Sequence, residues 1–225
     1  MTKKLHLAIP IAIIFCIIVF AAIFVNQPFV NQPPASTVVA GVAVGDTFTY
    51  NIRGFATKID ANATIPESTS QLNITEWFKV TITDINNSKV YFSSIWRFLN
   101  GTEIQKTGKV NIETGIDNSP DFWAIYASGL NAGDLARPLR EGLTINATEP
   151  RTYKDGERET NYVSLERLRY DTDDQSRTIS EYLSIYFDKQ TGMLVELRNN
   201  QVYSNPAILL LLEWRIIDST VWDIS

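Results

Sequence analysis

Cysteine and histidine, the residues that most often act as nucleophile, general base or metal ligand, occur once each in the 225-residue chain. Both, Cys16 and His6, lie in an apolar segment near the N-terminus. The rest of the chain therefore has no disulfide, no thiol nucleophile, no histidine base and no Cys/His metal site. Ser-His-Asp and Cys-His catalysis are excluded, which leaves carboxylates as the acid/base groups.

The densest group of carboxylates is the stretch YDTDDQS, which contains Asp171, Asp173 and Asp174. Hard oxygen ligands of this kind bind Ca²⁺, but the stretch lacks the glycine and the final Glu of an EF-hand loop. A solvated loop is the favoured interpretation. A glycosidase-like hydrolase would need two carboxylates facing each other, and the spacing nominates no such pair. We therefore expect a non-enzymatic protein without a cofactor.

Aromatic residues are abundant, with five Trp, nine Tyr and eleven Phe. Trp96, Phe122, Trp123 and Tyr126 are the candidates for lining an apolar ligand cleft. The competing interpretation is that such residues fill the core, where each buries a large area. It applies also to Trp214 and Trp222.

The chain has five N-x-S/T glycosylation motifs, against roughly 2.5 expected by chance. A glycan would be accessible on those that fall in turns. The five candidate sites are Asn62, Asn73, Asn86, Asn100 and Asn146.

These candidate residues belong mostly to segments with the two-residue periodicity of strands. Residues 72–113 predict a three-stranded meander, with a turn at 86–88 and a type I′ turn at Asn100-Gly101. Further hairpins are expected at Asp155-Gly156 and at 188–192. The apolar run 207–217, AILLLLEWRII, predicts a strand buried on both faces.

One helix is expected near residues 120–129. Ser119 can cap it, Pro120 suits its first position and Gly129 can end it. Aromatic and aliphatic residues between them recur at helical spacing. The predicted fold is mainly β (β-rich α+β). It is a strongly curved antiparallel sheet, or half-barrel, of about eight to ten strands with this helix on the concave side.

The motif G-x-x-x-G-D occurs twice, at 41–46 and at 129–134. The favoured interpretation is a turn used twice, with glycine for the backbone and aspartate for a side-chain hydrogen bond. An ancient duplication is the alternative.

Residues 5–25 form an apolar run that would span roughly 30 Å as a helix, which is the hydrocarbon thickness of a bilayer. Because Lys3 and Lys4 precede it, the N-terminus is expected in the cytoplasm. The run is long for a cleaved signal peptide, so residues 1–25 are interpreted as a transmembrane signal anchor. Cleavage is the alternative and would make the protein secreted. Residues 26–40 predict a proline-rich linker, and residues 41–225 an extracytoplasmic β-rich domain.

All 25 acidic residues and 18 of the 20 basic ones follow the apolar run, giving that part a charge of −7. A nucleic-acid surface needs clustered Lys and Arg, so nucleic acid is not an expected partner.

Several motifs together resemble known proteins. They are VGDTFTY (44–50), the second GD (133–134), YFDKQTGMLVEL and the closing WRIIDSTVW (214–222). With the anchor and linker, they are similar to a broad group of uncharacterised archaeal exported or membrane-anchored envelope proteins. The predicted architecture also resembles the LolA/LppX-like lipoprotein-carrier half-barrels. That second resemblance implies a concave face that holds an acyl chain.

Three functions follow as expectations. The first is a non-enzymatic, membrane-anchored envelope protein that binds or scaffolds a component of the cell surface. The second is a carrier or sensor of a lipid or other apolar ligand. The third is a carboxylate-based hydrolase.

Overall fold

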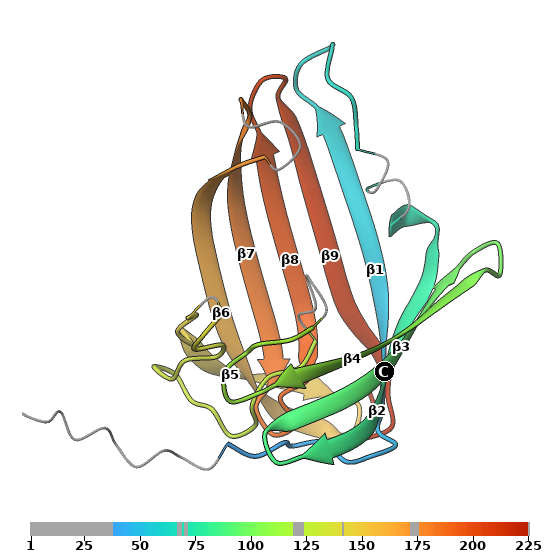
Figure 1. Ribbon diagram of the computed structural model, residues 1–225, viewed down its shortest axis with the longest axis vertical. Helices are drawn as coiled ribbons and strands as arrows, with labels where there is room; N and C mark the ends of the chain where they lie inside the picture. Colours follow the sequence, from blue (N-terminus) through green and yellow to red (C-terminus); the bar gives the residue numbers. More distant parts are fainter. Residues whose placement is uncertain are drawn as a thin grey trace, which may run out of the picture. The chain divides into compact units, whose positions relative to one another are not determined.

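The computed structural model describes residues 38–66, 69, 72–118, 124–140, 142–171 and 176–224 (Figure 1). In these residues nine strands form one antiparallel sheet in the order β4-β3-β2-β1-β9-β8-β7-β6-β5. The strands are β1 (Thr47–Lys58), β2 (Thr75–Asn86), β3 (Lys89–Phe98), β4 (Glu103–Asn111), β5 (Ala147–Tyr153), β6 (Gly156–Tyr170), β7 (Thr178–Asp188), β8 (Leu194–Tyr203) and β9 (Ile208–Ser219).

The sheet consists of two meanders joined at its centre. Strands β1 to β4 pair in sequence order, and so do β5 to β9. The first strand then pairs with the last, with Tyr50 opposite Ile216 and Lys58 opposite Ile208. The predicted meander over 72–113 is confirmed as β2, β3 and β4.

The predicted hairpins are confirmed, but one turn type is wrong. Gly101 has φ +83°, whereas Asn100 is not among the residues with positive φ. A type I′ turn needs positive φ at both central residues. The loop is longer than a two-residue turn: the Phe98 N–H donates to the Thr102 carbonyl, and the Thr102 N–H donates to Asn100 Oδ1.

The predicted helix near 120–129 is wrong for the residues that the structure describes, while 119–123 lie outside them. Ile125 forms a β-bridge with Met193, and the Tyr126 N–H donates to the Gly192 carbonyl at 2.8 Å. The backbone of this segment therefore pairs with the β7–β8 turn rather than with itself. Residues 124–127 are all buried, so the apolar spacing reflects a strap packed on the sheet and not a helix face.

The half-barrel prediction is also wrong. The sheet is open, with β4 and β5 as its edges, and it is not strongly curled. The mainly β class and the range of eight to ten strands are confirmed. No helix among the described residues is long and apolar enough to cross a bilayer, and the predicted span at 5–25 lies outside them.

The core lies on one face of the sheet, which we call the inner face. Ile52, Ile185, Leu197 and Ile216 point to it and are at most 3% exposed. Loop residues cover it at the end where β1 begins, among them Val42, Tyr126, Ala136, Leu143 and Ile145. The opposite face is called the outer face. Leu209 of β9 lies on it and is 40% exposed, so the prediction that this strand is buried on both faces is wrong.

The two G-x-x-x-G-D motifs form the same turn. Asp46 Oδ2 accepts from the Ala43 N–H at 2.7 Å, and Asp134 Oδ2 accepts from the Asn131 N–H at 2.8 Å. Gly45 and Gly133 have φ of +97° and +93°. Each glycine N–H donates to the backbone of an isoleucine, Ile82 or Ile145, whose own N–H donates back to the aspartate carbonyl. The interpretation of one turn used twice is confirmed.

Candidate functional site

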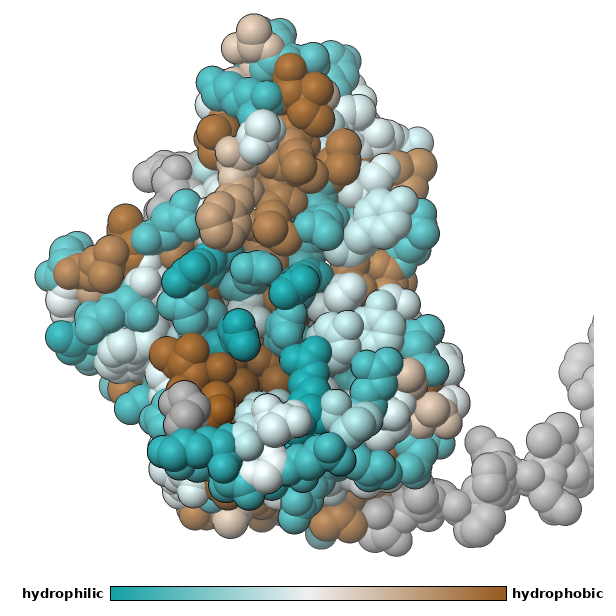
Figure 2. Space-filling view, turned by 180° about the vertical axis from the view of Figure 1, so that it is seen from behind, coloured by the Kyte–Doolittle hydropathy of each residue, from teal (hydrophilic) through white to brown (hydrophobic). Residues whose placement is uncertain are grey.

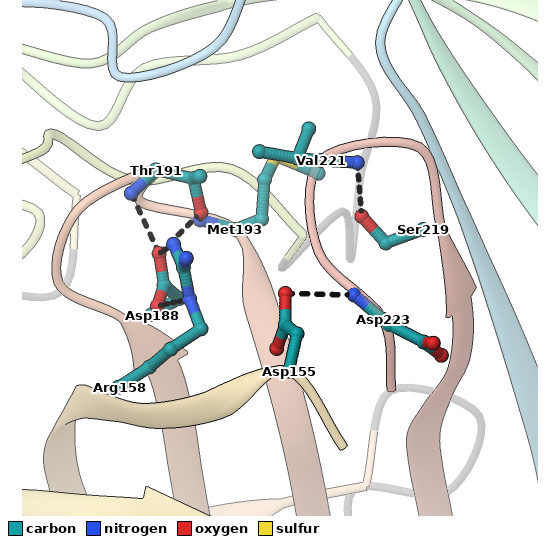
Figure 3. Close-up of polar contacts among 8 residues, drawn as sticks. All are labelled: Asp155, Arg158, Asp188, Thr191, Met193, Ser219, Val221 and Asp223. Atoms are coloured by element: carbon teal, nitrogen blue, oxygen red, sulfur yellow. Dashed lines mark hydrogen bonds and ion pairs between the residues drawn. The ribbon is translucent and has the colours of Figure 1, made fainter. Parts of the chain in front are cut away.

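Asp188, at the end of β7, is a buried carboxylate that accepts four hydrogen bonds (Figure 3). Its Oδ1 accepts from the Thr191 N–H and hydroxyl, both at 2.7 Å. Arg158 of β6 donates from Nε to Oδ2 at 2.8 Å and from Nη2 to Oδ1 at 3.0 Å. The aspartate thus closes the DKQTG turn and neutralises an arginine at the same time.

Arg158 connects this turn to the end of the chain. Its guanidinium carbon lies 4.5 Å from the centre of the Trp222 ring, a cation–π distance. Trp222 also packs on Phe48 of β1, with ring centres 5.8 Å apart. Arg158 therefore links two motifs that carried the sequence resemblance, YFDKQTGMLVEL through Asp188 and WRIIDSTVW through Trp222.

Glu181 of β7 is the second buried carboxylate and is 3% exposed on the inner face. It accepts from Arg167 Nε at 2.5 Å, Asn199 Nδ2 at 2.8 Å and Gln201 Nε2 at 3.1 Å. Burial acts to raise its pKa, but the hydrogen bonds from Asn199 and Arg167 and the charges of Arg167 and Arg169 hold the pKa below 4.5. Glu181 is therefore held as an anion and suits a counter-ion rather than a proton donor.

The other buried carboxylates also face arginine. Asp117 Oδ2 contacts Arg137 at 2.7 Å and Arg140 at 2.5 Å. Asp171, which was expected in a solvated loop with Ca²⁺ binding as the alternative, is instead buried at 8% exposure and lies 3.5 Å from Arg177. Asp173 and Asp174 lie outside the described residues. Among the residues that the structure describes, no group of three or more Asp, Glu, Cys or His is placed to hold a metal ion. The buried carboxylates therefore serve as structural counter-ions.

The structure describes two of the four predicted cleft residues, Trp96 and Tyr126, and each packs against a different ring of the core. Tyr126 is 1% exposed and stacks on Phe187, with ring centres 4.3 Å apart. Trp96 is half-buried on β3 and packs edge-on against Phe78 at 5.8 Å. Its Nε1 donates to the Thr75 hydroxyl at 2.8 Å. The other two, Phe122 and Trp123, lie outside the described residues, so the cleft stays a prediction.

The glycosylation candidates are all exposed and lie in turns, at or next to strand ends or, for Asn73, in a short helical segment before β2. Asn100 follows β3, and Asn86 is the last residue of β2. Two of the side chains also hold the fold: Asn73 Oδ1 accepts from the Gly54 N–H and Asn146 Oδ1 from the Ser164 N–H. None of the five, Asn62, Asn73, Asn86, Asn100 and Asn146, lies on β1 or on β6 to β9.

Those five strands carry a surface that the sequence did not reveal. On the outer face, Phe55 of β1 lies opposite Leu211, and Leu209 of β9 lies opposite Val202. Farther along the same face, Tyr182 and Leu168 continue the run on β7 and β6. The exposed fractions are 48% for Phe55, 71% for Leu168, 70% for Tyr170, 49% for Tyr182, 38% for Val202 and 40% for Leu209. We call these six side chains, with Leu211, the outer patch.

The outer patch stands above a charged band. Figure 2 shows apolar side chains gathered on this face, bounded on one side by strongly hydrophilic ones. In strand order the adjacent row reads Arg53, Glu213 and Arg198, and Arg198 Nε lies 3.3 Å from Glu213. If a large side chain has a full accessible area of about 200 Å², the six exposed residues present roughly 600 Å². That equals the upper range for the largest apolar patch of a monomer, and such patches are often functional.

A shallow polar pocket of about 140 Å³ lies below this band. Arg151, Glu196 and Arg215 line it, and Arg151 forms an ion pair with Glu196 at 3.0 Å. Arg151 also covers the Tyr186 ring at 4.1 Å. Two of the charged residues that line the pocket, Arg151 and Glu196, are therefore already paired with each other. The outer patch is the stronger candidate for a functional surface.

Comparison with known proteins gives no family. No family model and no curated protein matches the chain. One solved structure that matches is a predicted exported protein with a YmcC-like fold from Bacteroides fragilis. It is 11% identical, with a TM-score of 0.44, over 81% of this chain and all of the other. This likeness is too distant to assign a function, and the resemblances to archaeal envelope proteins and to lipoprotein carriers stay predictions.

Proposed function

We propose that the chain is a non-enzymatic, membrane-anchored envelope protein that binds or scaffolds another macromolecule outside the cell membrane. The observation that carries the binding role is the outer patch. Six large apolar or aromatic side chains stand 38–71% exposed on five adjacent strands. Exposing this much apolar area costs solubility, so its retention favours a contact surface.

The non-enzymatic part of the proposal is supported by the buried charges. Asp188, Glu181 and Asp117 each contact an arginine within 2.5–2.8 Å. A carboxylate that donates or accepts protons in catalysis needs a pKa near the working pH, whereas the hydrogen bonds and charges around Glu181 hold its pKa below the usual value.

The location is supported by the apolar run at 5–25 and the lysines before it. It is tested with the full chain carrying a C-terminal tag, expressed in cells whose outer layers are removed to leave intact membranes. Protease added outside should destroy the tag. In a separate sample that is not treated with protease, the intact chain should remain with the membrane after an alkaline wash. A tag that is protected until the membrane is lysed would overturn the proposal. If the alkaline wash removes the chain from the membrane, the protein is secreted rather than anchored.

A further inference from the structure

We infer that the outer patch is the contact surface between two copies of this chain, which stack face to face about a two-fold axis parallel to the strands. The inference names the partner of the outer patch in the proposed function, and it rests on the proposed location because both N-termini enter the same membrane. Its grounds are the area of the patch, the order of charges across the strands and the position of the chain's described start.

The patch has the form of one half of a β-sandwich. In a sandwich, the apolar faces of two antiparallel sheets meet at a spacing of about 10 Å. Here the inner face is covered at one end by the strap and loops, while the described residues place nothing over the outer patch. A second, identical sheet is the simplest partner of matching shape, because a two-fold interface uses the same surface on both copies.

The strand registers make this face complementary to itself. An axis midway between β8 and β9 places Leu209 of one copy over Val202 of the other, since these residues pair across the two strands. The same operation places Glu213 over Arg198. One strand farther out on each side, Phe55 lies over Tyr182, because Phe55 pairs with Leu211 and Tyr182 with Asn200. Two apolar contacts, Leu209 over Val202 and Phe55 over Tyr182, therefore adjoin the ion pair of Glu213 with Arg198, whereas Leu211 lies over Asn200.

An axis centred on β9 fails this comparison. It would place Glu213 against itself and Arg53 against Arg198. Like charges facing each other across an interface are unfavourable. The row Arg53, Glu213 and Arg198 therefore favours the axis between β8 and β9.

The area is sufficient for an association confined to a membrane. The apolar side chains that face the partner contribute roughly 350 Å² per copy, because no strand of the partner lies over Leu168 and Tyr170, and the charged row beside them adds a polar rim. A stable interface buries about 800 Å² per partner, and smaller ones are transient in solution. Two chains held in one membrane have a raised effective concentration, which favours a contact of this size.

The start of the described chain agrees with the direction of the axis. The Val39 carbonyl accepts from the Ser128 N–H, and Gly41 packs on the β7–β8 turn, so the chain enters at the loop-covered end of the sheet. An axis parallel to the strands brings both of these ends to the same side. An axis perpendicular to the strands would place them on opposite sides, which two anchors in one membrane do not allow.

The test uses crosslinking of full chains in membranes, with Cys16→Ser as the background so that each chain has one thiol. One tagged chain carries Phe55→Cys and a second, with a different tag, carries Tyr182→Cys. In the inferred pair these positions lie roughly 10 Å apart, whereas two copies of position 55 lie roughly 17 Å apart. A short bis-maleimide should therefore crosslink the mixed chains several-fold more than either chain alone. The matched control replaces Phe55→Cys by Lys58→Cys, an exposed residue of the same strand on the inner face, and should give no mixed product.

A second variant separates pairing from folding. Leu209→Glu should abolish the crosslink while keeping the same unfolding midpoint, because Leu209 is 40% exposed. Leu139→Glu, which is 69% exposed in a loop, should leave the crosslink unchanged. Absence of a mixed product, or equal crosslinking of like chains, would overturn the inference, as would a monomer that retains a lipid or glycan on this face. Since the protease experiment reads location independently, a tag exposed outside together with no crosslink would refute the pairing alone.

Discussion

Replacing Asp188 by alanine should be among the most destabilising single changes in the sheet. Four hydrogen bonds converge on its carboxylate, two from Thr191 and two from Arg158. The aspartate side chain is 1% exposed and that of Arg158 is 16% exposed. Alanine would leave the arginine charge without its partner and the turn without its cap.

The size of the loss follows from these contacts. Removing one member of a buried ion pair costs about 3–5 kcal/mol, because the other charge stays desolvated. The turn contributes about 1 kcal/mol more through the Thr191 N–H. We therefore expect Asp188→Ala to lower the free energy of unfolding by about 4–6 kcal/mol. For a domain of ordinary stability that is a large fraction of the total.

The measurement is urea unfolding of the full chain in detergent, followed by tryptophan fluorescence, since Trp222 contacts Arg158 directly. The matched control is Glu103→Ala, which removes an arginine contact of the same 2.8 Å length between exposed side chains. It should cost less than about 1 kcal/mol. The reasoning is refuted if Asp188→Ala costs no more than Glu103→Ala, or if an Asp188→Ala/Arg158→Ala double variant shows no coupling.

Three further outcomes are expected. Gly192→Ala should lower the free energy of unfolding by more than about 2 kcal/mol, because the added Cβ would lie 2.3 Å from the Tyr126 carbonyl oxygen. The control Gly129→Ala, at the same φ of +73° but in open space, should lower it by about 1 kcal/mol. Equal urea midpoints of the two variants would contradict this. Because folding lowers the pKa of Glu181, the stability that this carboxylate contributes is full above pH 4.5 and is lost as the pH falls through the folded pKa. Glu181→Gln should therefore lower the urea midpoint at neutral pH and flatten the decline of the midpoint below about pH 4.5. An unchanged slope of midpoint against pH would contradict this. If the source cell glycosylates exported proteins, intact mass should fall by one glycan on Asn100→Gln, whose side chain is exposed in the β3–β4 turn.

The turns and most strands could be predicted because their signals are local. Asn87 needs positive φ and sits between two alternating runs, so the β2–β3 turn follows from a few residues. The paired G-x-x-x-G-D turns were readable for the same reason. Each aspartate bonds to a backbone N–H three residues earlier, which depends on nothing distant.

The strap at 124–127 shows where local reading fails. Its apolar residues occur at helical spacing, yet its backbone pairs with Met193 and Gly192, far away in the chain. A tertiary partner that supplies backbone hydrogen bonds can override a helical pattern, and such a partner is invisible in one segment alone.

The outer patch was missed for a related reason. The run ILLLL is equally apolar whether or not a second layer covers it, so periodicity alone does not distinguish a buried strand from an exposed one. The position of β9 between β1 and β8 was also beyond prediction, because it depends on the register of two meanders. The Arg158–Asp188 pair carries no sequence signal apart from the DKQTG turn that contains one partner.

The pairing of the first strand with the last has a consequence for how the chain acquires its structure. β1 to β4, and β5 to β8, can each form from neighbours close in sequence, but β1 must wait for β9 before the sheet is continuous. Contacts of such long sequence separation form slowly. Until then β1 and β8 both present unpaired edges, which are templates for the wrong partner. Because synthesis proceeds from the N-terminus, the interval between the emergence of Thr47 and that of Ser219 is the period of greatest exposure to aggregation.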